Sequence, residues 1–129
     1  MEACSLSYGR IQRIPRITVR GGFVIVDVEF VAKPLVDAIG RPAVAKTQII
    51  GREFRLTVLS GLSSKEKSVT LYHEVLEGMT VASAETPTSV QDFNEGDFER
   101  AAHEAHKRFG PASPTSVNTM LQFYGFREE

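Results

Sequence analysis

The residues best suited to chemistry in this sequence are His73, Glu74 and Glu77, which form an H-E-x-x-E run. On an α-helix, side chains four residues apart project from one face about one turn apart, so His73 and Glu77 could meet at one divalent ion. In H-E-x-x-H zinc hydrolases the paired ligands hold Zn²⁺, and the glutamate between them is the general base that activates water. The run therefore predicts His73 and Glu77 as metal ligands and Glu74 as the catalytic base.

Glu77 stands where that zinc motif has its second histidine, and this change alters the expected chemistry. A carboxylate oxygen is also a normal zinc ligand, so the ligand geometry is kept. The added negative charge makes an activated water less acidic and shifts the metal preference towards harder ions such as Mn²⁺. The expected cofactor is Zn²⁺, with Mn²⁺ as the second choice. The alternative interpretation is a solvated helix face, on which Glu and His are common without any metal.

This geometry requires that the H-E-x-x-E run lie on a helix. Ser63 and Glu66 have the spacing of a capping box, in which the hydroxyl and the carboxylate satisfy each other's backbone N–H groups. The spacing predicts a helix that starts at Ser63 and runs to about Ser83. An apolar stripe at helical spacing would seat this helix on a sheet, and it consists of Val69, Tyr72, Leu76 and Met79.

The segment from Ser63 to Glu77 reads SSKEKSVTLYHEVLE and resembles the active-site helix of ImmA/IrrE-like minimal zincin metallopeptidases. Those enzymes also place a capped, polar first turn ahead of the motif. The resemblance covers this segment and the order of sheet before helices, and it departs from the family at Glu77, where the family has a histidine. It implies a zinc-dependent peptidase that takes a third metal ligand from a later helix.

Three residues of the following polar segment could supply that third ligand. Glu99, His103 and His106 recur at helical spacing on one side of the segment. At about 100° per residue, His106 borders the apolar face of this helix, whereas His103 points further outward. The order of preference is therefore His106, then Glu99, then His103. The alternative for both histidines is a solvent-facing polar stripe.

The N-terminal part of the chain predicts a β-hairpin. Residues 11–20 carry β-branched side chains in extended spacing, and Phe23–Val31 alternates apolar and acidic residues. Gly21-Gly22 between them suits a turn. Pro15 cannot donate to a strand ladder, so it needs an edge or bulge position.

A second extended region completes the predicted sheet. After a loop at Pro34–Pro42, the segment Thr47–Leu59 alternates again between apolar and polar residues. Gly51 within it is expected to form a β-bulge or a hairpin turn. Strands close together in sequence favour a compact antiparallel sheet over about residues 10–60.

The last part of the chain predicts two further helices after a connector at Thr86–Asp92. Gly110-Pro111 is a typical helix stop, and it ends a segment with one apolar face, formed by Phe98, Ala101, Ala102, Ala105 and Phe109. Ser113 suits an N-cap, Pro114 a first helical position and Gly125 a C-terminal cap, which brackets a third helix. The expected fold is α+β, an antiparallel sheet followed by three helices over about residues 63–125, the first of which carries H-E-x-x-E.

Length and composition narrow the class of protein. A chain of 129 residues fits one domain, residues 1–129. Lys+Arg 15 against Asp+Glu 16 gives no broad basic field for nucleic acid or an anionic membrane. No apolar run approaches a membrane span and no apolar leader follows Met1, so a cytoplasmic protein is expected. Cys4 is the single cysteine, which excludes an intramolecular disulfide and a cysteine-cluster zinc site.

Two functions compete on these residues, and a third is set aside. The first is a metal-dependent hydrolase, most simply a zincin-like peptidase acting on a peptide or protein substrate. The second is a non-catalytic interaction protein on the same scaffold. DNA binding through the last two helices is disfavoured because Thr115–Tyr124 contains no Lys or Arg. The sequence determines neither the substrate nor the oligomeric state.

Overall fold

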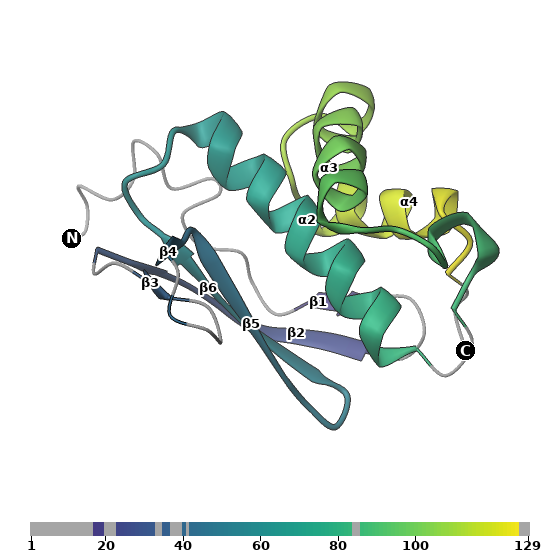
Figure 1. Ribbon diagram of the computed structural model, residues 1–129, viewed down its shortest axis with the longest axis horizontal. Coiled ribbons are helices and arrows are strands. Elements are labelled where there is room, and N and C mark those ends of the chain that lie inside the picture. Colours follow the sequence, from purple (N-terminus) through teal and green to yellow (C-terminus); the bar gives the residue numbers. More distant parts are fainter. Residues whose placement is uncertain are drawn as a thin grey trace.

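The first half of the chain forms a sheet and the second half forms helices. The computed structural model describes residues 17–19, 23–32, 35–36, 40, 42–83 and 86–126. Figure 1 shows the strands gathered in one layer and the helices in another. The predicted α+β class is therefore confirmed. The expectations for Cys4, Pro15 and the Gly21-Gly22 turn fall outside the described residues.

The main sheet has four strands in the order β1-β2-β6-β5. β1 (Ile17–Val19) pairs antiparallel with β2 (Phe23–Val31), and β5 (Ala45–Ile50) pairs antiparallel with β6 (Glu53–Leu59). The central strands β2 and β6 run parallel. The prediction of an antiparallel sheet is therefore wrong, because the sheet is mixed and its centre is a parallel pair.

The parallel pair follows from the unequal burial of the β5–β6 hairpin. Phe54, Leu56 and Val58 of β6 are almost completely buried, whereas alternate residues of β5 are exposed. β6, which carries these buried residues, lies at the centre of the sheet beside β2. After β2 the chain therefore passes over to the sheet edge, where it forms β5 before it returns as β6. Gly51, with a φ of 62°, makes the hairpin turn that returns the chain as β6.

The crossing segment between β2 and β5 differs from the simple loop expected at Pro34–Pro42. Two short strands, β3 (Leu35–Val36) and β4 (Pro42–Ala43), pair antiparallel in a separate small sheet. Two-residue strands carry too little pattern to be distinguished from a loop. Figure 1 places this small sheet near the start of the helix that carries the H-E-x-x-E run.

That helix, α2 (Ser64–Ala82), has the boundaries that its caps predict. Ser63 is the N-cap: its hydroxyl oxygen accepts from the Glu66 N–H at 3.1 Å, and the Glu66 carboxylate accepts from the Ser63 N–H at 2.9 Å. The helix ends at the C-cap Ser83. The run from His73 to Glu77 therefore lies well inside a regular helix, and the spacing argument applies to it.

The two later helices are α3 (Glu95–Phe109) and α4 (Pro114–Phe123), as the stop and cap residues predict. A 3₁₀-helix, η3 (Thr88–Val90), lies inside the segment expected to be a plain connector. Asn94 caps α3 by a capping box with Asp97, whose three-residue spacing matches that of Ser63 and Glu66. Among the described helices, none is long and apolar enough to cross a membrane.

α2 lies between the sheet and the other helices, as Figure 1 shows. It contacts β5 and β6 on one side and α3 and α4 on the other. Most of its apolar residues are buried, although Val81 near its end is exposed. Tyr72 donates its hydroxyl proton to the Gly110 carbonyl or the Ser116 hydroxyl, at 2.6 and 2.8 Å. A helix held on two sides positions its remaining polar residues rigidly, which is what a binding site requires.

Gly78 allows α2 to approach the sheet closely, and we expect Gly78→Ala to destabilise the protein by about 1–3 kcal/mol. A Cβ at this position would lie 2.9 Å from a ring carbon of Phe54, which is fully buried and cannot move aside. Alanine favours a helix over glycine by about 1 kcal/mol, so the clash must outweigh this gain. Gly96→Ala in α3 is the matched control, because its Cβ meets no atom closer than 3.4 Å. Urea denaturation would measure both, and equal midpoints for Gly78→Ala and wild type would contradict the close packing.

Candidate metal site

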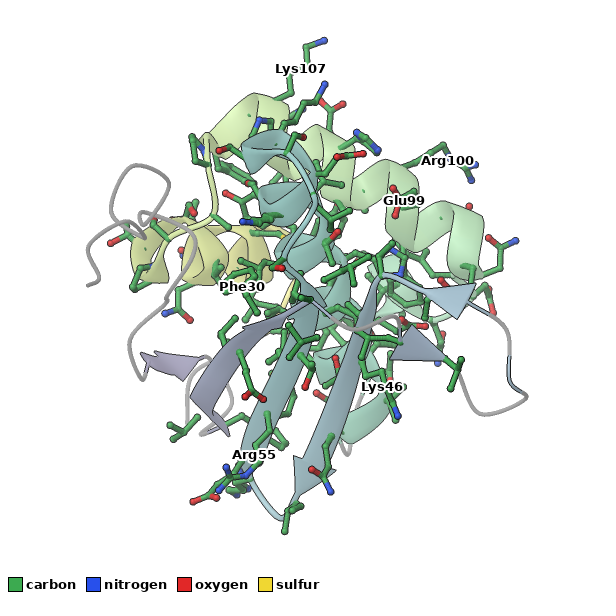
Figure 2. The ribbon with its side chains drawn as sticks, turned by 90° about the vertical axis from the view of Figure 1, so that its left-hand side faces the viewer. Phe30, Lys46, Arg55, Glu99, Arg100 and Lys107 are labelled. Atoms are coloured by element: carbon green, nitrogen blue, oxygen red, sulfur yellow. The ribbon has the colours of Figure 1, made fainter. Side chains whose placement is uncertain are left out.

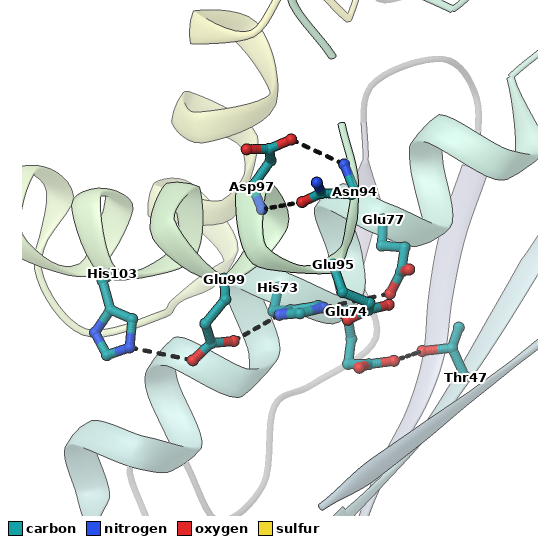
Figure 3. Close-up of polar contacts among 9 residues, drawn as sticks. All are labelled: Thr47, His73, Glu74, Glu77, Asn94, Glu95, Asp97, Glu99 and His103. Atoms are coloured by element: carbon teal, nitrogen blue, oxygen red, sulfur yellow. Dashed lines mark hydrogen bonds and ion pairs between the residues drawn. The ribbon is translucent and has the colours of Figure 1, made fainter. Parts of the chain in front are cut away.

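His73 is the centre of the site, and its two ring nitrogens face different partners. Its side chain is 11% exposed and lies between α2 and α3. Nδ1 is 2.7 Å from Glu99 Oε1. Nε2 is 3.1 Å from Glu95 Oε1 and 3.4 Å from Glu77 Oε1. Figure 3 shows these carboxylates around the imidazole ring, two of them from α3 and one from α2.

Glu95 was not among the residues singled out from the sequence, although a local signal could have found it. The capping box of Asn94 and Asp97 starts α3 at Glu95. Glu95 and Glu99 are then four residues apart and share one face of the helix. This face lies against His73, so both carboxylates reach the same imidazole ring.

Glu74 extends from α2 towards the edge strand β5 of the sheet. It is partly buried, and its Oε1 accepts a hydrogen bond from the Thr47 hydroxyl on β5. Burial raises the pKa of Glu74, while the hydrogen bond from Thr47 and the charge of His73 act in the opposite direction. A glutamate with a raised pKa is better matched to proton transfer near neutral pH than an ordinary surface glutamate.

The carboxylates hold His73 in its charged form when no metal is present. Burial alone lowers the pKa of His73, but hydrogen bonds to Glu77 and Glu99 and the charges of Glu74 and Glu95 together raise it to about 9. The hydrogen bond to His73 lowers the pKa of Glu77. Hydrogen bonding between Glu77 and Glu95 raises the pKa of Glu95 and further lowers that of Glu77, as expected of two carboxyls that lie close together. An excess of negative charge therefore converges on one imidazole.

A broad, open cleft of about 1000 Å³ gives access to this cluster. The cleft is bounded by β5 and by the facing surfaces of α2 and α3. Figure 2 shows Lys46 on β5 and Glu99 on α3. Lys46 and Thr47 line one side, opposite the glutamates. A smaller hollow of about 370 Å³ is lined by both Glu99 and His103, with Val44, Leu62, Lys65, Glu66, Val69 and Thr70 completing its wall.

Among the described residues, the group that could hold a metal ion comprises His73, Glu74 and Glu77. One ligand atom from each lies within 4.8 Å of the others. The structure thus brings together the three residues of the H-E-x-x-E run at a distance suited to a shared ion, although it does not determine which ion. Glu95 adds a carboxylate 3.1 Å from the same histidine nitrogen, Nε2.

The structure does not bring His106, the first choice for the third ligand, to this cluster. His106 Nδ1 is 2.8 Å from Ser68 Oγ, which also accepts from the Ala112 N–H. α2 and α3 run in opposite directions, so Ser68 faces His106 while His73 faces Glu95 and Glu99. Burial, followed by the charges of Lys65 and His103, lowers the pKa of His106, which suits a neutral ring that accepts the Ser68 proton.

The second and third choices lie closer to the site but occupy different positions. Glu99 contacts His73 through Nδ1, on the opposite side of the ring from Glu77 and Glu95. His103 does not touch His73 in the contacts described, and its Nε2 is 3.1 Å from Glu99 Oε2. Glu99 and His103 therefore lie on the Nδ1 side of the His73 ring, away from Nε2, which faces Glu77 and Glu95.

Comparison with protein-family models, with curated proteins and with solved structures finds no match for this chain. Its function is therefore inferred from the geometry of His73 and the carboxylates around it.

Proposed function

We propose that this protein is a divalent-metal-dependent hydrolase whose ion is held by His73 Nε2, Glu77 and Glu95, with Glu74 as general base. One observation carries the proposal: Nε2 lies 3.4 Å from Glu77 and 3.1 Å from Glu95, carboxylates from two different helices. Three protein ligands with a position left open for substrate is the usual composition of a catalytic zinc site. The catalytic base then comes from the residue next to the histidine ligand.

The ligand atoms around His73 are better satisfied with a divalent ion bound than without one. Glu77 and Glu95 lie close enough for a hydrogen bond between them to raise the pKa of Glu95, and a bound dication would take the place of the proton that they share. One imidazole nitrogen with carboxylate oxygens is compatible with Zn²⁺, and the high oxygen content also favours Mn²⁺. Zn²⁺ remains the first expectation, with Mn²⁺ as the alternative.

When bound, the ion would supply a Lewis acid that polarises the scissile carbonyl and makes water more acidic. Glu74 takes the proton from the attacking water and delivers it to the leaving nitrogen. Thr47 donates a hydrogen bond to Glu74 Oε1 and so fixes the direction of the carboxylate. The second oxygen of Glu74 is left for the water that attacks the substrate.

The edge strand β5 favours a peptide or protein substrate. β5 ends the sheet order β1-β2-β6-β5, and among the described strands it pairs only with β6. The other edge of β5, on which no described strand lies, offers main-chain N–H and C=O groups to which an extended peptide can pair. Residues of β5 line the same cleft as Glu74 and His73, so a peptide on this edge would pass the catalytic base. The proposed reaction is therefore peptide-bond hydrolysis.

A non-catalytic interaction protein is the second candidate, and the charge state of His73 favours it. A histidine with a pKa of about 9 is protonated at neutral pH and satisfies the surrounding carboxylates without a metal. In that case the cluster is an ion-pair network that holds α3 on α2. The two candidates differ in one measurable property, which is metal binding.

Metal titration of the purified protein tests the proposal. After treatment with a chelator, wild type is expected to bind a single Zn²⁺ or Mn²⁺ per chain, measured by calorimetry and elemental analysis. His73→Ala and Glu95→Gln are expected to lose this binding, because each removes a ligand. His106→Ala is the matched histidine control and should retain it, since His106 lies on Ser68 instead. A wild-type protein that takes up neither metal would leave the interaction protein as the preferred function.

A further inference from the structure

Glu99 lies between two histidines, and each of its carboxylate oxygens has its own partner. Oε1 is 2.7 Å from His73 Nδ1, and Oε2 is 3.1 Å from His103 Nε2. Figure 3 shows the three side chains in a row, with His73 at the inner end and His103 at the outer end. A carboxylate can only accept hydrogen bonds, so both histidine nitrogens in these contacts carry a proton.

We propose, on the basis of the metal-dependent hydrolase described above, that Glu99 is a positioning residue that acts on the metal through His73 and does not bind the metal itself. A neutral imidazole has a single N–H group, and Glu99 holds that proton on Nδ1. The lone pair is then on Nε2, the nitrogen that faces Glu77 and Glu95. Glu99 thus fixes both the tautomer and the orientation that metal binding requires.

The geometry separates Glu99 from the metal ligands. Its contact with His73 is on the Nδ1 side of the ring, whereas Glu77 and Glu95 approach Nε2. The sequence predicted Glu99 as a candidate metal ligand. In the proposed arrangement it instead accepts a hydrogen bond from His73, which is itself the ligand.

His103 has a smaller part in the same arrangement. Its bond to Oε2 restricts rotation of the Glu99 carboxylate about its own axis. The pair is four residues apart on α3 and half-exposed, at 54% for His103 and 51% for Glu99, so solvent weakens it. We therefore expect a large effect on metal affinity from Glu99 and only a small one from His103.

Metal titration of Glu99→Ala, Glu99→Gln and His103→Ala tests this assignment. Loss of an outer hydrogen bond to a metal-binding histidine lowers affinity by about 10- to 100-fold, which is the expected effect of Glu99→Ala. Glu99→Gln should recover part of the loss, because the amide oxygen still accepts from Nδ1. His103→Ala should change affinity much less. The control is Glu104→Gln, which removes an exposed glutamate of the same helix that pairs with Arg108 and should leave affinity unchanged.

A second readout does not depend on metal and keeps the two proposals distinguishable. The ¹⁵N chemical shifts of His73, measured without metal at a pH above 9 where the ring is neutral, report which nitrogen carries the proton. In the metal-free wild type Glu99, 2.7 Å from Nδ1, competes for this proton with Glu95 and Glu77, which are 3.1 and 3.4 Å from Nε2, and the shorter contact favours Nδ1. Glu99→Ala should shift the proton towards Nε2. Wild type that binds no metal but has the Nδ1 proton would contradict only the hydrolase.

Two results would overturn the role of Glu99. In the first, Glu99→Ala keeps both wild-type affinity and the Nδ1 tautomer, which would mean that His73 is oriented by other contacts. In the second, Glu99→Ala and Glu99→Gln both abolish metal binding as Glu95→Gln does, which would make Glu99 a direct ligand. A loss that is partial, and smaller for glutamine than for alanine, is the result that supports a positioning role.

Discussion

Glu74→Gln is expected to lower the rate of peptide hydrolysis by about 10²- to 10⁴-fold while leaving the bound metal in place. Glutamine keeps the shape of the side chain and can still accept the hydrogen bond from Thr47. It cannot take a proton from water, which is the step assigned to Glu74. The measurement is cleavage of a broad peptide mixture by the metal-loaded protein, read by mass spectrometry, together with metal content. Wild type should cleave, and Glu74→Gln should cleave at least about 10²-fold more slowly.

The variant also separates the two roles that the cluster allows for Glu74. Its oxygen lies within 4.8 Å of ligand atoms from His73 and Glu77, so it could bind the ion directly. A Glu74→Gln protein that loses its metal would make Glu74 a ligand and would contradict the general-base assignment. Unchanged cleavage would contradict it in a different way. Glu104→Gln, on the exposed side of α3, is the control for removal of a carboxylate elsewhere.

The second large effect concerns pH, and we expect the metal-free protein to lose about 3 kcal/mol of stability between pH 6.5 and pH 9. The pKa of His73 is about 9 in the folded protein, above the ordinary value of 6.5 that it has when unfolded. Between these values the folded state binds more protons than the unfolded state, so stability falls as pH rises. The full contribution is present below pH 6.5 and is gone above pH 9. The side chain of His73 is only 11% exposed, but Glu95 and Glu99 are 74% and 51% exposed, so solvent screens part of the interaction and about 3 kcal/mol is the upper end of the expected loss.

Urea denaturation at several pH values, with a chelator present, measures this dependence. His73→Gln removes the titrating group and should flatten the curve in the same pH range. His106 does not obscure it, because burial and the charges of Lys65 and His103 lower its pKa, so its effect lies below pH 6.5. Identical curves for wild type and His73→Gln would contradict the charged state of His73. Bound metal should reverse the trend, since the metal competes with the proton for Nε2.

The sequence by itself determined the boundaries of the helices. The capping box of Ser63 and Glu66, the stop at Gly110 and the Ser113-Pro114 start all act within one turn of the chain. A local hydrogen bond needs no partner from elsewhere, so its residues can be recognised in the sequence alone. The placement of the H-E-x-x-E run on α2 and the convergence of its three side chains follow from the same local rules.

Tertiary structure decided the direction of the central strands. An alternating apolar pattern is the same for a strand with a parallel or an antiparallel neighbour, so β2 and β6 could not be distinguished from an antiparallel pair by their sequences. What placed β6 beside β2 was the burial of Phe54, Leu56 and Val58 beneath α2, which depends on packing between distant segments.

Tertiary structure also decided which residues of α3 reach His73. A helical wheel shows on which face of α3 Glu99 and His106 lie. It does not show which residue of α2 each of them contacts. The opposed directions of α2 and α3 set Ser68 against His106 and His73 against Glu95 and Glu99. His106 lies away from the cluster for this reason, and Glu95 lies beside His73 because α3 begins at the level of His73. Only the packing of the two helices contains that information.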